Sequence, residues 1–364
     1  MRLAIGVSVL ALCAAVPLIA QPSSSPGAAE AIREAREPFD PAKARAVVEK
    51  LATALEENFV FPDTGKAYAA ALRTKLAAGG YRDFPDGQAF ADAVTADLQA
   101  VHKDGHLALH VVPAEDRRPD PQGQGGPAMR SESGIARSGW LADGIAYIDF
   151  RVFPGNETTL AELRRFIAAH RDARALIIDA RAHRGGGLAE MDLLFPELFT
   201  RATPLVMMDT REAVVRARGA PVEAGSSLRT VKAPPSVVRL EHFVTPAARQ
   251  GGLAKAKVYL LVSGRTASAA EHLALSLKRT HRATLVGETT RGAGHYGGML
   301  PMDDSMTYAA FIPVGRTFDP DTGEGWEGVG VKPDVAVPAD QALDRALQLA
   351  GAGTDAKTAL AQLR

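Results

Sequence analysis

The sequence predicts an α/β fold preceded by a helical region, and three observations support this. Amphipathic segments with helical spacing fill residues 41–101. From residue 145 onward, short apolar runs alternate with amphipathic runs, which is typical of parallel strands joined by helical crossovers. The chain has 364 residues, enough to bury more than one hydrophobic core.

The first 20 residues are expected to be a cleaved export signal. Arg2 is followed by an apolar run that ends at Ala20, and a linker of residues 21–40 begins with Gln, Pro and a Ser-rich stretch. We therefore expect a protein of the bacterial periplasm or the extracellular space, without a stable membrane anchor. An uncleaved signal that anchors the chain is one alternative. A lipoprotein acylated at Cys13, the only cysteine, is the other.

Residues 41–113 are predicted to form a helical subdomain that ends in a strand. Pro62 and the pair Gly79 and Gly80 separate three amphipathic helices, which most simply form a small bundle. Residues 107–111 alternate as a strand. The apolar positions of the three helices and of this strand are Val47, Val48, Leu51, Leu55, Tyr68, Leu72, Leu76, Phe90, Val94, Leu98, Val101, Leu107, Leu109 and Val111.

Residues 114–137 are rich in Pro, Gly, Gln and Ser and are expected to be a loop, too short to hold a folded insert. Residues 138–350 are expected to form the α/β domain, and residues 351–364 a tail. Within the domain, residues 209–250 resist assignment. The predicted strands are 145–150, 175–179, 257–262 and 284–287, and the predicted helices are 160–170, 188–198, 269–280 and 340–349.

Charge composition narrows the class of partner. The chain has 42 Lys and Arg residues and 42 Asp and Glu residues. No excess charge draws it to nucleic acid or to an anionic membrane surface. Polypeptides and small molecules are the expected partners, and the sequence does not indicate the oligomeric state.

Ser268 lies where an apolar run stops at small residues and an amphipathic run begins. This pattern predicts a strand-to-helix turn that presents a hydroxyl, with Ala267 and Ala269 leaving space around it. The first amides of the helix have no partner inside the helix and can hold an oxyanion. The alternative is that Ser268 is an ordinary helix N-cap.

A serine nucleophile needs a base, and His106 is the candidate among nine histidines. It follows a tight turn and enters the predicted strand. His102, His106 and His110 fall four residues apart, which resembles a zinc pattern, but Gly105 should break the helix that would align them. We expect no metal and no cofactor.

Two further segments are candidates for the site, a glycine run and a turn that contains a glutamate. The run from His183 to Gly187 follows a predicted strand but matches neither the phosphate-loop nor the dinucleotide pattern, so it is a plain turn or part of an oxyanion hole. Glu327 lies between Trp326 and Gly328, in surroundings that can fix a carboxylate.

Taken together, the chain resembles the S41 family of serine peptidases, which includes tail-specific proteases, tricorn-core peptidases and interphotoreceptor retinoid-binding protein. The likeness covers residues 41–350 and is strongest to the tricorn and retinoid-binding branch. It rests on an ordered set of segments: 58–62 (NFVFP), 80–81 (GY), 104–107 (DGHL), 179–181 (DAR), 185–186 (GG), 263–271 (SGRTASAAE), 287–290 (GETT) and 326–334 (WEGVGVKPD).

The resemblance implies a crotonase/ClpP-like ββα catalytic core with an N-terminal helical-bundle subdomain. It also implies an exported serine endopeptidase that acts on peptides through an acyl-enzyme. Ser268 matches the nucleophile, His106 the base and Glu327 the acid. The matching oxyanion-hole and supporting residues are Gly185 or Gly186 with Ala269, and Gly105 and Glu271.

The chain departs from the family pattern at four places. Ala293 stands where tail-specific proteases have a lysine base, so a Ser-Lys dyad is not expected. His183 replaces the usual asparagine before the glycine pair, and Gly105 replaces the tricorn-type serine beside the base. No PDZ domain fits between Val112 and Ser138.

Two other classes of function stay open. One is a binding protein without catalysis on the same scaffold, as the retinoid-binding relatives show is possible. The other is an esterase of the α/β-hydrolase kind, but that fold uses a GxSxG motif and places its histidine after the serine. Here the motif is absent and His106 precedes Ser268.

Overall fold

Three helices open the described part of the chain, as predicted. The computed structural model describes residues 37–117 and 132–363, so the predicted signal, Cys13 and most of the linker lie outside it. The helices are α2 (Pro41–Asn58), α3 (Pro62–Ala77) and α4 (Gly87–Val101). The carboxylates of Asp40 and Asp86 accept amide hydrogen bonds at the starts of α2 and α4, as N-caps do.

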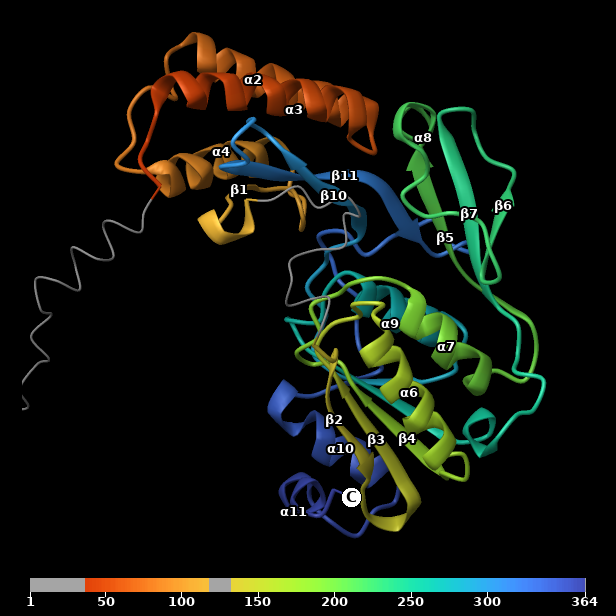
Figure 1. Ribbon diagram of the computed structural model, residues 1–364. Helices are drawn as coiled ribbons and strands as arrows, with labels where there is room; N and C mark the ends of the chain where they lie inside the picture. The colour runs from red at the N-terminus through yellow and green to blue at the C-terminus, as the bar shows by residue number, and fades with distance from the viewer. Residues whose placement is uncertain (1–36, 118–131, 364) are drawn as a thin grey trace, which may run out of the picture. The chain divides into compact units, whose positions relative to one another are not determined.

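An antiparallel sheet shares its core with these helices (Figure 1). Its order is β1 (Leu109–Val111), β11 (Tyr308–Phe318), β5 (Thr203–Arg211), β7 (Val237–Val244) and β6 (Leu228–Val231), and β10 (His295–Pro301) also pairs with β11. Tyr308, Ala310 and Ile312 of β11 belong to the same buried cluster as the apolar faces of the helices. The three helices share one buried cluster, as the predicted helical subdomain requires, and this cluster also includes a sheet that was not predicted.

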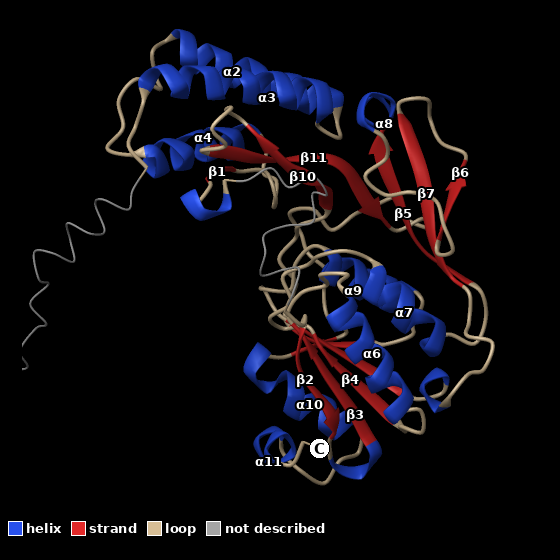
Figure 2. Cartoon of the chain, viewed as in Figure 1, coloured by secondary structure: helices blue, strands red, loops and turns tan. Residues whose placement is uncertain are grey.

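A second, mostly parallel sheet forms the α/β part (Figure 2). Its order is β12 (Val335–Ala336), β9 (Thr284–Gly287), β8 (Lys257–Val262), β4 (Ala175–Asp179), β3 (Ile145–Phe150) and β2 (Ile135–Trp140). Only the β2–β3 pair is antiparallel. One face packs on α6 (Glu157–Ala169), α7 (Ala189–Leu198) and α9 (Ala269–Arg279), and the other on α10 (Ala342–Leu349) and α11 (Ala356–Ala361). The predicted alternation is confirmed.

Three segments differ from the prediction. Strand β2 begins at Ile135, inside the stretch expected to be a loop. The unassigned residues 209–250 contain the end of β5, then α8 (Glu212–Arg218), β6 and β7, while β10 and β11 were not predicted. Residues expected to be a tail hold α11, in which Ala359 is buried.

The parallel sheet brings three loops to one edge. Strands β4, β8 and β9 are neighbours and run parallel. Residues 180–188, 263–268 and 288–294 follow the carboxyl ends of these strands. Ligands of open α/β sheets bind at such an edge.

Candidate active site

Ser268 occupies the N-cap position of α9 with a backbone conformation that N-caps do not normally have. Its φ is 59° and its ψ is −121°, whereas Asp40 and Asp86 are extended. A non-glycine residue at such angles costs about 1–3 kcal/mol and persists only where its surroundings fix it. An ordinary cap has no need of this strain, so helix capping alone does not explain Ser268.

Glu271 fixes this conformation from below. Its buried carboxylate accepts four hydrogen bonds, from the amides of Ser268, Gly292 and Ala293 and from the Thr290 hydroxyl, at 2.6 to 2.8 Å. Burial raises the pKa of the Glu271 carboxyl, and these hydrogen bonds oppose the rise. Because Ser268 and Ala293 donate to the same oxygen, the Ser268 turn and the loop after β9 are joined at this carboxylate.

The glycine run after β4 lies directly against Ser268. Gly185 and Gly186 have φ values of 114° and 126°, a region that favours glycine. A Cβ on Gly185 would lie 2.7 Å from the Cβ of Ser268, and one on Gly186 would lie 2.0 Å from the Phe153 carbonyl oxygen. Only glycine fits at both positions.

His183 holds the glycine run in place. Its Nδ1 accepts a hydrogen bond from the Gly185 amide at 3.0 Å, and its carbonyl accepts one from the Ala267 amide at 3.1 Å. The ring is fully buried and packs edge-on against Phe153. Burial lowers the pKa of His183 to about 3, so the ring is neutral and carries its proton on Nε2.

Two backbone amides beside Ser268 have no partner. The Gly185 carbonyl accepts a hydrogen bond from the Phe153 amide at 2.8 Å. Because a trans peptide points its C=O and N–H in opposite directions, the Gly186 N–H faces away from Phe153. Within the described residues, the amides of Gly186 and Ala269 donate to no acceptor. Of the two glycines predicted for an oxyanion hole, Gly186 has the free donor.

His106 is held by its backbone and by stacking. Its amide donates to Asp104 Oδ1 at 2.9 Å, and its ring stacks on Phe311 with centroids 5.0 Å apart. Nδ1 is buried without a partner. Burial is the main cause that lowers the pKa of His106; the Asp104 charge opposes it, and Arg291 and His295 add to it.

Glu327 supports the turn that carries His106. Its carboxylate accepts hydrogen bonds from the amides of Gly105, Gly294 and His295, at 2.6, 2.6 and 2.9 Å. Among the described residues, no hydrogen bond joins His106 to Glu327 or to the Ser268 hydroxyl. The structure therefore brings Glu327 to the backbone beside His106 and not to its imidazole.

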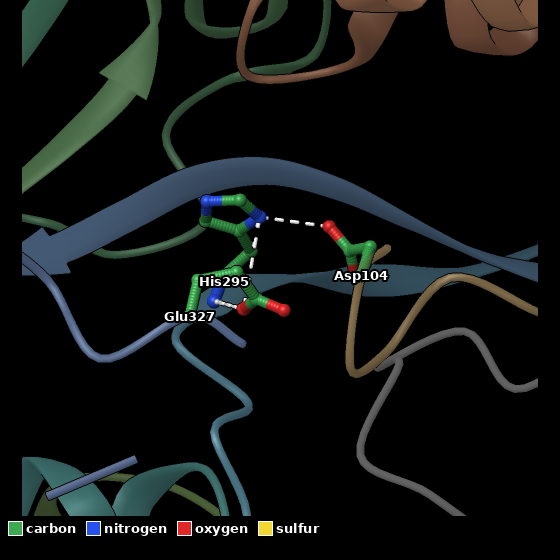
Figure 3. A group of neighbouring side chains, drawn as sticks. All are labelled: Asp104, His295 and Glu327. Atoms are coloured by element: carbon green, nitrogen blue, oxygen red, sulfur yellow. Dashed lines mark hydrogen bonds and ion pairs between the residues drawn. The ribbon is translucent and has the colours of Figure 1, made fainter. Parts of the chain in front are cut away.

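Sequence reasoning missed the role of His295 and of the Asp104 side chain. In Figure 3 the ring of His295 points at Asp104, with Nδ1 2.7 Å from Oδ2, and Glu327 lies beside both. The pair lies 191 residues apart along the chain, so no local spacing signals it. The two carboxylates and His295 together fix the 104–107 turn.

The same three side chains offer ligand atoms that lie within 4.8 Å of one another, a spacing that suits a metal ion. Each nearby oxygen already accepts an N–H donor, however. Oδ2 of Asp104 takes the imidazole N–H, and Oε2 of Glu327 takes two amides. We interpret the cluster as a hydrogen-bonded network.

Ala293 and Gly105 pack against each other. A Cβ on Gly105 would lie 2.9 Å from both the Ala293 Cα and the Gly292 carbonyl oxygen. Ala293 is buried, and its carbonyl accepts a hydrogen bond from the Trp326 indole at 3.0 Å. A serine at position 105 therefore does not fit here without a shift of the facing loop.

Comparisons with known proteins agree with this fold. Residues 144–337 match the model of peptidase family S41, and residues 28–136 match that of the N-terminal domain of S41 peptidases in eukaryotic interphotoreceptor retinoid-binding protein.

None of the helices in the described part of the chain combines the length and the apolar character that a membrane span requires.

Solved structures with a similar fold include three of low sequence identity. A lipoprotein from Streptococcus agalactiae is 13% identical with a TM-score of 0.53, over 86% of this chain and 98% of that one. A candidate peptidase from Parabacteroides merdae is 16% identical, also with 0.53, over 87% and 96%. The tricorn protease is 13% identical with 0.51, over 88% of this chain and 36% of that one. The matched family models show that the chain belongs to peptidase family S41 and is of the serine peptidase class.

Proposed function

We propose that the chain is an exported serine endopeptidase with Ser268 as nucleophile and His106 as general base. The observation that carries the proposal is the strained backbone of Ser268, which lies against Gly185 and beside two unpaired amides. Such strain at a residue with a nucleophilic side chain is typical of active sites. Polypeptides are the proposed substrates.

The proposed reaction begins with proton transfer from the Ser268 hydroxyl to His106. Nε2 is the proposed acceptor, because it is not among the buried unpaired atoms, whereas Nδ1 is. The alkoxide adds to the peptide carbonyl carbon, and the amides of Gly186 and Ala269 stabilise the oxyanion. The imidazolium then protonates the leaving amine as the C–N bond breaks. Water, deprotonated by the same imidazole, hydrolyses the acyl ester and regenerates the hydroxyl.

We propose that two carboxylates, Asp104 and Glu327, share the role that a single acid has in a catalytic triad, namely to support the base His106. Asp104 lies next to His106, and its negative charge raises the pKa of the imidazole. It therefore stabilises the imidazolium that forms during proton transfer. Glu327 acts through the Gly105 amide and keeps the turn in place. Glu271 has the corresponding task for Ser268.

Active-site labelling tests the proposal. A fluorophosphonate reagent is expected to modify Ser268 in the wild type but not in Ser268→Ala, and digestion of an unstructured peptide library should release internal fragments. An enzyme that cleaves esters but no peptide in the library would overturn the peptidase assignment.

A binding protein without catalysis is the second candidate. The observation in its favour is the missing hydrogen bond between Ser268 and His106, together with the unpaired Nδ1 of His106. Such a protein would react slowly or not at all with the fluorophosphonate and would leave the library intact.

Export is proposed from the sequence of the first 20 residues. Expression of the full chain in a bacterial host, followed by N-terminal sequencing of the periplasmic protein, is expected to give a mature end near Gln21. Recovery of the intact N-terminus in the membrane fraction would favour an uncleaved anchor, and a modified Cys13 would favour a lipoprotein.

A further inference from the structure

Three arginines lie on the three loops that meet at Ser268. Arg184 directly precedes Gly185, which lies against Ser268. Arg265 lies three residues before Ser268 on the loop after β8. Arg291 lies on the loop after β9, and its amide donates to the Thr266 carbonyl at 2.9 Å. All three are exposed.

Within the described residues, none of the three guanidinium groups has a hydrogen-bond or ion-pair partner. Within residues 37–117 and 132–363, no carboxylate forms an ion pair or a hydrogen bond with them. Arginines nearby in the same sheet behave differently, since Arg181 pairs with Asp179 at 2.6 Å and Arg151 with Asp149 at 2.8 Å.

The carboxylates of Glu271, Asp104 and Glu327 do not neutralise these charges at the surface. Glu271 and Asp104 are buried, and Glu327 is half-buried. Each of their oxygens accepts N–H or O–H donors from the surrounding chain. The arginine charges, in contrast, stand in solvent in a chain whose net charge is zero.

The loop that carries Arg291 lies beside the turn that carries His106, because a Cβ on Gly105 would lie 2.9 Å from the Gly292 carbonyl oxygen. The positive charge of Arg291 is one of the causes that lower the pKa of His106. Arg291 therefore lies on the side of the site from which the base acts, whereas Arg184 lies on the side of the glycine run.

We propose that this endopeptidase selects polypeptide segments with acidic side chains close to the bond that is cleaved, and that Arg184, Arg265 and Arg291 supply the selectivity. The inference rests on the proposed function for the cleavage step, but not for the binding step. Unpaired positive charges around a cleft attract and orient an anionic ligand over about one Debye length, ~8 Å at physiological salt. Arginine also binds carboxylates in a bidentate manner.

The test separates binding from catalysis by use of Ser268→Ala in the full mature chain. Fluorescence anisotropy would compare labelled peptides that differ only by Glu, Gln or Lys on both sides of one bond. We expect the Glu peptide to bind most tightly. Each Arg→Gln change should weaken its binding about two- to fivefold and leave the Gln peptide nearly unaffected, as expected for solvent-screened charge pairs. The preference should shrink as salt is raised.

A matched control removes the same net charge elsewhere. Arg165, Arg201 and Arg218 are exposed and form no ion pair in the described part of the chain. Their triple Gln variant should retain the preference for Glu, whereas the triple variant of Arg184, Arg265 and Arg291 should lose it. Equal loss in both would show a general charge effect and overturn the assignment of these residues.

Two further arms complete the design. Amidation of the peptide C-terminus should change little; if it removes binding, the recognised carboxylate is the chain end and the proposal for side chains is wrong. With the active wild type, cleavage of Glu and Gln peptides at equal kcat/KM would likewise overturn the selectivity. Selective binding without any cleavage would instead leave the selectivity intact and contradict the peptidase proposal.

Discussion

The two halves of the candidate site are fixed in different ways. On the Ser268 side, buried side chains hold the backbone, since Glu271 accepts the Ser268 amide and His183 accepts the Gly185 amide. On the His106 side, carboxylates hold the backbone of the turn, but the imidazole forms no hydrogen bond with any residue that the structure describes. The proposed nucleophile and its proposed oxyanion donors are thus pre-organised, while the ring of the proposed base is placed by stacking on Phe311.

This difference predicts that removal of a reacting side chain and removal of a residue that holds it in place should lower activity by separate, measurable amounts. Support on the Ser268 side passes through single hydrogen bonds to buried groups, and loss of one leaves a donor unsatisfied. On the His106 side, Glu327 is half-buried, so water can replace part of the hydrogen bonding that it supplies. Disruption should therefore be more severe on the first side than on the second.

The largest effect is expected when a reacting group is removed from either half. Ser268→Ala and His106→Ala should each lower kcat by at least about 10³-fold, because nucleophile and base act as a unit. Steady-state hydrolysis of a peptide substrate measures this, and an unchanged thermal midpoint serves as the control for folding. Near wild-type turnover in either variant would exclude the assigned pair.

The next largest effect is expected at His183. In His183→Leu the Gly185 amide loses its acceptor, so the Gly186 N–H is free to turn away, and we expect kcat to fall about 100-fold with little change in KM. His183→Asn places an amide oxygen near the position of Nδ1 and should recover most of the rate. If both variants lose activity equally, the ring acts through packing and not as an acceptor.

A smaller effect is expected at Glu327. Glu327→Gln keeps the shape of the side chain but turns one acceptor into a donor that faces backbone amides, so one of three hydrogen bonds is lost. A cost of about 1–2 kcal/mol in the transition state corresponds to roughly a tenfold lower kcat/KM. A loss as large as that of His106→Ala would mean that Glu327 contacts the imidazole directly during catalysis.

The smallest expected effect on the His106 side is a shift in the pH dependence of activity. A lowered pKa keeps the imidazole neutral, and able to accept a proton, to values below its ordinary 6.5. Activity should therefore be full near neutrality and be lost as pH falls through this lowered pKa. Removal of a nearby positive charge in Arg291→Gln should move the acidic limb upward by a few tenths of a pH unit. A downward shift would contradict the proximity of Arg291 to the base.

On the Ser268 side, the lowered pKa of His183 makes the stability of the fold depend on pH over a defined range. His183 has a pKa of about 3 when folded and an ordinary value near 6.5 when unfolded. The unfolded chain binds more protons in between, so stability falls as pH is lowered from about 6.5 toward 3. The acid sensitivity of the unfolding midpoint should be reduced in His183→Asn, with wild-type unfolding as the reference.

Local pattern was sufficient for much of the fold. The helices of residues 41–101 and the strands β3, β4, β8 and β9 have strong periodicity or continuous apolar runs, and they lie where predicted. Strand β11 was missed because Pro313 and Gly315 interrupt its pattern, and its partners come from distant parts of the chain. Propensity is a weak guide where tertiary pairing decides.

The sequence by itself determined that Ser268 lies at a strand-to-helix turn, that a glycine run follows a neighbouring strand and that the chain resembles S41 peptidases. Only the tertiary structure decided which amides are free, that His183 accepts the Gly185 amide and that His295 bonds Asp104. The physical reason is that turn position and periodicity are encoded in consecutive residues. Hydrogen-bond partners are set by contacts between segments, here up to 222 residues apart.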